Sequence, residues 1–357
     1  MNSVHLHQKL VKQLQTIGLQ IGQAQRVNLA LWCQALAVSP NCHLATLALA
    51  LPLPGQRENL IQRLRRSLKN VRLKPQACYR PVVGHLFSHW SGQEVDLVMD
   101  RTDIENRWSI LSLGAAYRKR LLPLTWQVLP FGGTSAEEQI GLLRQVRALL
   151  PPPEQVRVHF YGDSEFRAVS LQQTCQQDGW HWQVGLKSDI RFRQADDRWQ
   201  PLHTLNLQPG QRQYVNHIYL TQKHNFGPIN LMADWAASQQ QPRYWAVDLP
   251  ANAQAWRRGR KRFWTEPTFR DWKGYGFDLE RSKIDDPDRL NILLLGIAVT
   301  TVWMIHIGDW LTLHGHRHLL TPAHKTDYSL FRLGRDYVQR CRTMGWSIPI
   351  GFTVSHG

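Results

Sequence analysis

The sequence contains few cysteines, and their spacing excludes two common kinds of small, cross-linked protein. Five cysteines are scattered over 357 residues without a C-x-x-C pair: Cys33, Cys42, Cys78, Cys175 and Cys341. An odd set of this kind is neither a disulfide framework nor a cysteine-based zinc site, and it indicates reduced thiols in a cytoplasmic protein. The N-terminal stretch 1–7 is also too polar for a secretory signal peptide.

One long stretch has no Asp, Glu, Lys or Arg at all. It covers residues 290–308 and is nearly apolar, so by length alone it could form a short membrane span. It nevertheless carries the polar residues Asn291, Thr300, Thr301 and His306. We therefore expect a helix enclosed by protein, and no membrane partner.

Acidic residues are scarce relative to basic ones. The 43 Lys and Arg residues outnumber the 27 Asp and Glu residues, which gives a net charge of +16 and a pI near 10.0. This balance favours a polyanionic partner such as a nucleic acid. The residues expected to contact DNA form two clusters, Arg257, Arg258, Arg260 and Lys261 in one, Arg63 and Arg66 in the other. An ordinary solvated helix face explains the second cluster equally well.

The patterning divides the chain into three parts. Residues 1–92 carry an apolar stripe at helical spacing, formed by Leu60, Ile61, Leu64 and Leu68. We expect a helical, DNA-binding N-terminal domain there, a catalytic domain over 93–320 and a C-terminal tail over 321–357. Residues 190–242 differ from the rest of the catalytic domain and are expected to form a β-rich insertion.

Strand and helix patterns alternate beyond residue 93. Strands are predicted at 94–100, 108–117, 121–129, 156–162, 181–187 and 244–249, with one helix opened by a capping box at Thr134 or Ser135 and another over 165–177. The order β-β-β-α-β-α-β resembles that of the ribonuclease-H-like fold, an α/β architecture. In that fold the first and fourth strands are neighbours, so Asp100 and Asp163 should lie side by side.

Three carboxylates are the candidate catalytic and metal-binding residues. Asp100 follows the apolar run 95–99, Asp163 follows the run 156–162, and Glu266 lies in a basic, aromatic helical stretch. Buried carboxylates are either paired with basic groups or hold cations. An all-oxygen set suits Mg²⁺, with Mn²⁺ as a substitute, and can hold two ions about 3.5–4 Å apart for phosphoryl transfer. The alternative is that each acid is half of a structural salt bridge.

The stretch around Glu266 also carries candidate phosphate ligands. Lys273 follows Glu266 by seven residues, which places both on one helix face, and Arg262 precedes it by four. Pro267 disfavours a continuous helix, so we expect the helix to begin with Thr265 as its N-cap. Arg262 and Lys273 are expected to bind phosphates that flank the cut.

These motifs together resemble a known family. Glu266-x6-Lys273 with Arg262 looks like the Y-R-E-K signature of bacterial insertion-sequence DDE transposases of the insertion-sequence-four branch. Asp100-Arg101-Thr102 and Asp163-Ser164-Glu165-Phe166 are similar to its first and second aspartate motifs, and the resemblance extends over about 57–340. Gly259 stands where the signature has tyrosine, and Ser164 stands where the second motif usually has arginine.

The resemblance implies cut-and-paste DNA transposition by a nucleoid-associated bacterial protein. A homodimer would bind terminal inverted repeats, nick the element ends, often free them through a hairpin, and join the 3′ ends to target DNA. In related enzymes the β-rich insertion supplies an aromatic residue that stacks a flipped base, a role for which Trp235 and Trp245 are candidates. With 15 tryptophans in the chain, core packing is the alternative for either.

Two other functions remain open from the sequence. The chain could be a catalytically inactive DNA-binding protein derived from a transposase, or a structure-specific nuclease without strand transfer. The histidines His314, His316, His318 and His324 lack the usual spacing of a zinc site, and a polar loop near DNA is expected there.

Overall fold

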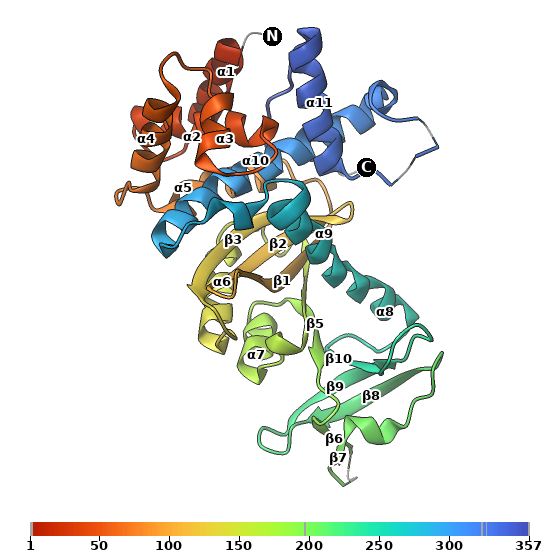
Figure 1. Cartoon of the computed structure of the whole chain (residues 1–357). Coiled ribbons are helices and arrows are strands. Elements are labelled where there is room, and N and C mark those ends of the chain that lie inside the picture. Colours follow the sequence, from red (N-terminus) through yellow and green to blue (C-terminus); the bar gives the residue numbers. More distant parts are fainter. Residues whose placement is uncertain (1–2, 196–197, 323, 326, 356–357) are drawn as a thin grey trace.

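The computed structural model describes residues 3–195, 198–322, 324–325 and 327–355. The other positions belong to the predicted polar start, β-rich insertion and C-terminal tail, and those parts of the predictions lie outside the described residues. Helices occupy one end of the molecule, a sheet lies in the middle, and a β-rich extension forms the other end (Figure 1).

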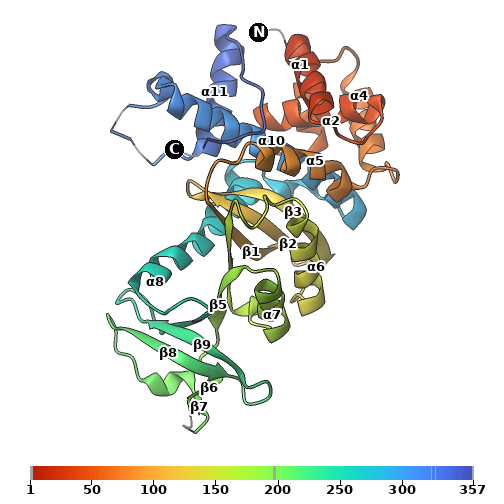
Figure 2. The same ribbon diagram turned by 180° about the vertical axis from the view of Figure 1, so that it is seen from behind.

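The N-terminal helices pack against one another and, in part, against the longest helix of the described chain (Figure 2). Their bounds are α1 (Ser3–Thr16), α2 (Gln23–Val38), α3 (Leu44–Ala50), α4 (Arg57–Leu68) and α5 (Pro75–Ser88). The long helix α10 (Pro287–Leu313) contacts α2, α4, α5 and β3. Although α10 is apolar and long enough to cross a membrane, 83% of its most apolar window is buried inside the protein. It is the core helix that its polar residues indicated.

The described strands form one mixed sheet. Their bounds are β1 (Glu94–Ile104), β2 (Trp108–Tyr117), β3 (Arg120–Pro130), β4 (Arg157–Gly162), β5 (His181–Leu186), β6 (Arg191–Gln194), β7 (Gln200–Pro201), β8 (Arg212–Leu220), β9 (Phe226–Asp234) and β10 (Arg243–Val247). The order across the sheet is β3-β2-β1-β4-β5-β10-β9-β8-β6-β7. The first five strands therefore have the ribonuclease-H-like arrangement that their order in the sequence indicated.

The pairing of β1 with β4 confirms that the first and fourth strands are neighbours. The two strands are parallel, and Val98 lies opposite Tyr161. One detail of the prediction is wrong, because β1 continues to Ile104 and Asp100 lies inside it. The strand is longer since its tight turn to β2 comes only at Glu105 and Asn106, which both have positive φ.

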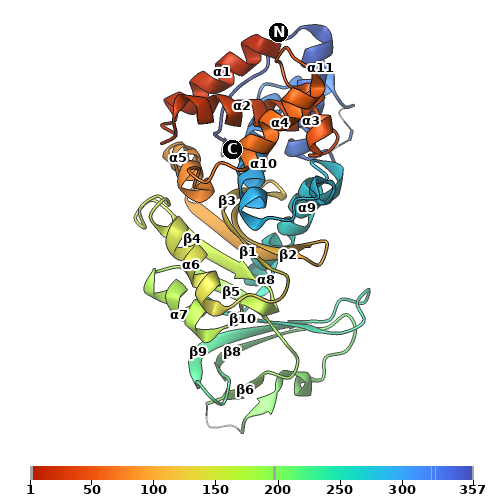
Figure 3. The same cartoon turned by 60° about the vertical axis from the view of Figure 1, so that its left-hand side comes forward.

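Helices cover both faces of the central strands (Figure 3). Helix α6 (Ala136–Arg147) begins with the predicted capping box, formed by Ser135 and Glu138. Helix α7 (Val169–Gln177) starts four residues later than predicted. Its expected first turn is a separate 3-10 turn, Ser164–Phe166, because the Asp163 side chain accepts a hydrogen bond from the Glu165 backbone N–H and caps that turn.

The insertion extends the central sheet. Strand β10 pairs antiparallel with β5 on one side and with β9 on the other. Strands β9, β8, β6 and β7 then continue the sheet outward. The insertion is β-rich, as predicted, and its backbone is hydrogen-bonded to the central strands through β10.

Two helices near the C-terminus cross at glycine contacts. A Cβ on Gly334 of α11 (Leu330–Met344) would lie 2.0 Å from the Met304 carbonyl oxygen. A Cβ on Gly308 of α10 would lie 2.0 Å from the Leu330 carbonyl oxygen. Both distances are shorter than any van der Waals contact, so each glycine permits the close approach of the two backbones.

We expect Gly334→Ala to lower the free energy of unfolding by about 3 kcal/mol, because the added methyl group forces the helices apart. The matched control is Gly141→Ala in α6, where a Cβ meets no atom within 4 Å. Removing a helical glycine there should stabilise the protein by roughly 0.5–1 kcal/mol. Denaturant unfolding measures both changes, and equal effects of the two substitutions would contradict the close crossing.

Candidate active site

Asp100 is held rigidly near the middle of the sheet. Its Oδ1 accepts a hydrogen bond from the Arg101 backbone N–H at 2.8 Å, and its Oδ2 accepts one from the Thr265 hydroxyl at 2.6 Å. Burial raises the pKa of Asp100, and the nearby charge of Asp163 raises it further. The two hydrogen bonds and the positive charge of Arg262 oppose that rise. Sequence reasoning missed the part played by Thr265.

Asp163 follows the end of the neighbouring strand β4. Its turn lies directly against β5, where a Cβ on Gly185 would meet the Ser164 backbone nitrogen at 2.8 Å. A larger residue at 185 would push this turn away, so Gly185 permits the second acid to approach. Ser164, the residue that replaces arginine in the motif, lines a cavity together with Asp163 and Arg262.

The segment that carries Glu266 differs from the prediction. Helical backbone runs from α8 (Ala253–Gly259) through the 3-10 turn Arg260–Trp264 and α9 (Thr265–Arg270) into a π-helical turn, Asp271–Tyr275. Thr265 is therefore not an N-cap. The helical path can continue because Pro267 lies near the start of α9, where its missing N–H costs little.

Arg262 lies between two of the three acids. Its guanidinium is 3.6 Å from Asp100 Oδ2 and 3.9 Å from Glu266 Oε1. The Glu266 side chain is 59% exposed, whereas that of Asp100 is 15% exposed. Among the described residues there is no group of three or more His, Cys, Asp and Glu side chains that could hold a metal ion. The structure thus brings Asp100 and Asp163 together and links Glu266 to Asp100 through a cation.

The donor chemistry nevertheless fits a divalent metal. Asp163 lies close enough for its charge to help raise the pKa of Asp100, and a metal ion bound between two carboxylates relieves such repulsion. The Arg262 guanidinium is a positive charge standing within 4 Å of two of the carboxylates.

Part of the basic cluster predicted to bind DNA is paired inside the protein. Arg258 donates to Glu94 at 2.8 Å and also contacts His159, while Lys261 contacts the buried Asp96. These contacts hold the helical segment against β1. The exposed members of the cluster are Arg257 and Arg260.

The second basic cluster divides in the same way. Arg63 donates two hydrogen bonds to the Asn28 side chain and so joins α4 to α2. Arg66 is exposed.

The position of Lys273 differs from the prediction that it shares a helix face with Glu266. Its ammonium donates to the Asp103 carbonyl oxygen at 2.6 Å and lies 3.1 Å from Glu280. Neither contact includes Glu266. The π-helical turn that contains Lys273 adds backbone between helical repeats, so the seven-residue spacing no longer aligns the two side chains.

Hydrogen bonds join the residues that follow Asp100 and Asp163 in the sequence. Arg101 donates to Glu165 at 3.0 Å, and the other oxygen of Glu165 accepts from the Thr134 backbone and hydroxyl. Arg101 also contacts Asp103. The residues that follow Asp100 and Asp163 in the sequence thereby fix the two strands and the start of α6 relative to one another.

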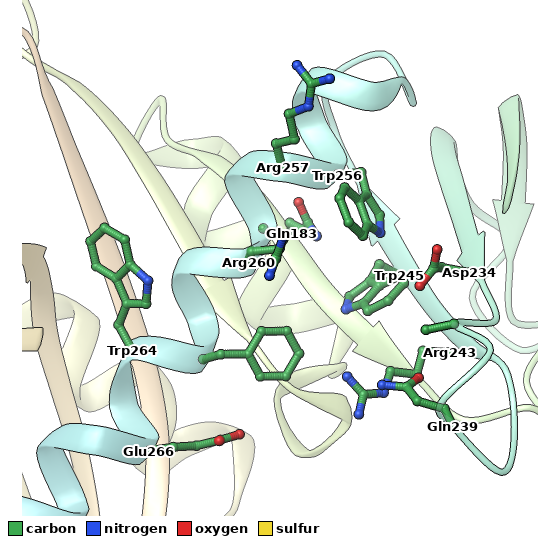
Figure 4. A pocket seen from close by; sticks show the side chains of 13 residues that line it. Gln183, Asp234, Gln239, Arg243, Trp245, Trp256, Arg257, Arg260, Trp264 and Glu266 are labelled. Carbon is green, nitrogen blue, oxygen red and sulfur yellow. The ribbon is translucent and has the colours of Figure 1, made fainter. Parts of the chain in front are cut away.

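A cavity of about 740 Å³ opens beside Glu266 (Figure 4). Its lining combines aromatic rings with basic and amide side chains, namely Gln183, Asp234, Ala236, Gln239, Arg243, Trp245, Trp256, Arg257, Gly259, Arg260, Phe263, Trp264 and Glu266. Trp245 belongs to it, whereas the Trp235 ring packs against the core and donates to the Gln239 carbonyl oxygen. Sequence reasoning missed Trp256 and Gln183.

The histidine-rich loop shows ring contacts. The rings of His314 and His316 lie 5.0 and 5.2 Å from that of Trp310, and His318 contacts His316. No metal-binding group involves them in the described part of the chain.

The raised pKa of Asp100 predicts a cost in stability. A carboxylate whose pKa is higher in the folded state weakens folding once pH exceeds that pKa, and the cost disappears below its pKa in the unfolded chain. We therefore expect Asp100→Asn to be more stable than the wild type at neutral pH, with a difference that shrinks toward pH 3. Denaturant unfolding as a function of pH tests this, and a variant less stable at pH 7 would contradict it.

Comparison with known proteins identifies the family of this chain. Residues 94–303, more than half of the chain, match the family model described as "Transposase DDE domain". A search of curated proteins gave no match. A solved structure to which the chain is similar is the piggyBac transposase synaptic complex with hairpin DNA, at 11% identity and a TM-score of 0.45, covering 93% of this chain and 76% of that one. The family match includes Asp100, Asp163 and Glu266, and the chain belongs to the transposases that have a DDE domain.

Proposed function

We propose that this transposase cuts DNA at the ends of its element and joins the freed 3′ ends to target DNA, as a member of the insertion-sequence-four branch. The observation that carries the proposal is the placement of Asp100 beside Asp163, with Glu266 linked to Asp100 through Arg262. Three carboxylates from two neighbouring strands and one helical segment are what metal-assisted phosphoryl transfer requires.

Asp100, Asp163 and Glu266 would hold Mg²⁺, for which Mn²⁺ can substitute. When bound, the metal activates the attacking oxygen and stabilises the leaving oxygen. Thr265 and the Arg101 backbone fix both oxygens of Asp100, so this ligand has its orientation before the metal binds. Glu266 is exposed and paired only loosely with Arg262, which leaves it free to turn toward the aspartates.

Arg262 is proposed to move from carboxylate to phosphate. With Asp100 and Glu266 holding a metal, the Arg262 guanidinium would no longer compensate their charge and would be available to a phosphate oxygen beside the cut. Lys273 is proposed as a second phosphate ligand. Its ammonium contacts Asp103 and Glu280, and a remaining N–H group can donate to a phosphate oxygen.

The partner is proposed to be double-stranded DNA, both at terminal inverted repeats and at the target site, bound by a homodimer. The net charge of +16 supports a polyanion, and the exposed arginines Arg257, Arg260 and Arg243 line the cavity next to Glu266. The N-terminal helices would add a second DNA contact through Arg66, which faces solvent.

The cavity beside Glu266 supports a hairpin step in which one nucleotide leaves the duplex. Trp245 is half-buried and lines both this cavity and the adjoining one that contains Asp163. A base that stacks on it would keep the DNA end bent next to the acids.

One observation supports a different function, a transposase-derived protein that binds DNA without cutting it. The Arg262 guanidinium already compensates two of the carboxylates, and no three-carboxylate metal group is formed within the described residues. A nuclease without strand transfer would share the site and differ only in the fate of the 3′ ends. Assays of cleavage and of joining separate these functions from transposition.

Cleavage of supercoiled and end-containing DNA with Mg²⁺ or Mn²⁺ tests the site. We expect Asp100→Ala, Asp163→Ala and Glu266→Ala each to reduce nicking to background while DNA affinity changes less than about threefold, because the acids hold the metal and not the DNA. Lys273→Ala should retain partial strand transfer. Nicking by the wild type that persists in Glu266→Ala would reject the proposed active site, and tight binding without any nicking would favour the inactive function.

The divided basic cluster predicts two different effects. Arg260→Ala should lower the slope of log affinity against log salt by roughly one unit, because one phosphate contact is lost, and should leave stability unchanged. Lys261→Ala should instead lower the free energy of unfolding by about 3 kcal/mol, since it leaves Asp96 buried without its cation. Salt titrations of DNA binding and denaturant unfolding measure the two effects. A loss of stability in Arg260→Ala, or a lower salt slope with normal stability in Lys261→Ala, would contradict the division of the cluster.

The two tryptophans should also behave differently. Trp245→Ala is expected to weaken binding of a DNA hairpin with one unpaired nucleotide by roughly 5- to 150-fold, the range of one lost stacking contact. Trp235→Ala should leave this binding unchanged, because the ring does not line the cavity. Fluorescence anisotropy gives both affinities, and normal binding and hairpin formation in Trp245→Ala would remove the stacking role.

A further inference from the structure

A largely buried glutamine lines the cavity beside Glu266. Gln183 lies on β5 and is only 6% exposed, yet it lines the cavity beside Glu266. No hydrogen bond to its side chain occurs among the residues that the structure describes. An amide that forms no hydrogen bond within the protein has its donor and acceptor groups available to a ligand in the cavity.

The Gln183 amide packs directly against Gly259 of α8, where the absence of a side chain leaves room for it. A Cβ on Gly259 of α8 would lie 1.9 Å from Gln183 Nε2 and 2.6 Å from its Oε1. Any other residue at 259 would displace the amide from its place in the cavity lining. Gly259 does not have a positive φ, so backbone strain is not the reason for glycine here.

The surroundings of Gln183 match a nucleobase. Trp245 offers an aromatic surface, and Trp256 is covered by the Arg212 guanidinium at 3.5 Å from its ring centroid. A second amide, that of Gln239, lines the cavity, and its Oε1 is buried without a partner in the described part of the chain. Figure 4 shows Trp245, Trp256 and Gln183 grouped on one side of the cavity.

The charge at the cavity fits a base that is still attached to its phosphates. Arg243, Arg257 and Arg260 are exposed and line the same cavity. The volume of about 740 Å³ lies in the range of small-ligand sites, roughly 300–1,000 Å³. The cavity therefore offers aromatic stacking, amide hydrogen bonding and cations for the backbone together.

We propose that Gln183 reads the edge of one extrahelical nucleobase in this cavity and so makes the site base-specific. The inference rests on the proposed function, because it takes the DNA of that reaction as its ligand. A glutamine amide presents one donor beside one acceptor, and this pair matches the N7 and N6 groups of adenine. Adenine is thus the expected base, and Gln183 is a specificity-determining residue that does not touch the reacting phosphate.

The test measures binding of the full-length chain to DNA hairpins in EDTA. Each hairpin carries one unpaired nucleotide, either A, C, G, T or an abasic site, and fluorescence anisotropy gives the affinity. We expect the wild type to prefer A over the other bases by roughly 5- to 150-fold, the range of one bidentate contact. Gln183→Leu should bind all five hairpins within about threefold of one another, because stacking and phosphate contacts do not distinguish bases strongly.

Two further variants make the result independent of one substitution. Gly259→Ala should abolish the preference in the same way, since its Cβ displaces the amide. Gln254→Leu, which changes an exposed glutamine on α8, should keep the full preference. If Gln183→Leu is thermally unstable, Gln183→Glu can replace it. This substitution keeps the size of the side chain and removes its N–H donor, so it should likewise lose the preference for A.

Absence of any base preference in the wild type would overturn the inference, as would a preference that survives in Gln183→Leu or Gln183→Glu. Metal-dependent nicking by the wild type, measured in parallel, separates this outcome from failure of the proposed function. Nicking without an amide-dependent preference rejects only the role of Gln183. An amide-dependent preference without nicking retains base recognition and rejects catalysis.

Discussion

The structure depends on a row of contacts between one face of β1 and the helical segment 253–275. Every second residue of β1 contacts the segment. Glu94 and Asp96 form ion pairs with Arg258 and Lys261. Val98 packs against Trp264, and Asp100 accepts a hydrogen bond from Thr265. The first three contacts lie three helical residues apart, which advances roughly 5 Å and is close to the roughly 6.6 Å of two strand residues. The fourth comes from Thr265, the residue directly after Trp264. The two elements can therefore run side by side with acid facing base.

This row explains how a site forms from distant parts of the chain. The parallel pairing of β1 with β4 brings Asp163 to Asp100, and the docked segment brings Glu266 within reach through Arg262. Asp100 is largely enclosed where these elements meet, and this loss of contact with water raises its pKa. The same docking forms one wall of the cavity, because Gly259 lies against Gln183.

The sequence predicted the parts of the fold that follow from local patterns. The order of elements along the chain, the capping box of α6 and the core role of α10 came from apolar periodicity and polar spacing. The pairing of the first and fourth strands was expected from the resemblance to the ribonuclease-H-like fold. The sequence could not show which basic side chains pair with acids inside the protein. Lys261 and Arg257 look equally basic in the sequence, and only the position of β1 determines that Lys261 pairs with Asp96 while Arg257 stays exposed. The helical path continues through Pro267 and includes a π-helical turn at Lys273. Both follow from packing of the segment against β1, and local sequence preferences do not predict such packing.

Diffraction at the manganese absorption edge, from crystals of the full chain with Mn²⁺ and DNA, would test most directly whether the three acids form one site. If the three acids form one metal site, we expect anomalous peaks in contact with Asp100, Asp163 and Glu266, with Arg262 moved onto a phosphate. A chain that binds DNA while Arg262 still bridges Asp100 and Glu266, with no manganese at the aspartates, would contradict it.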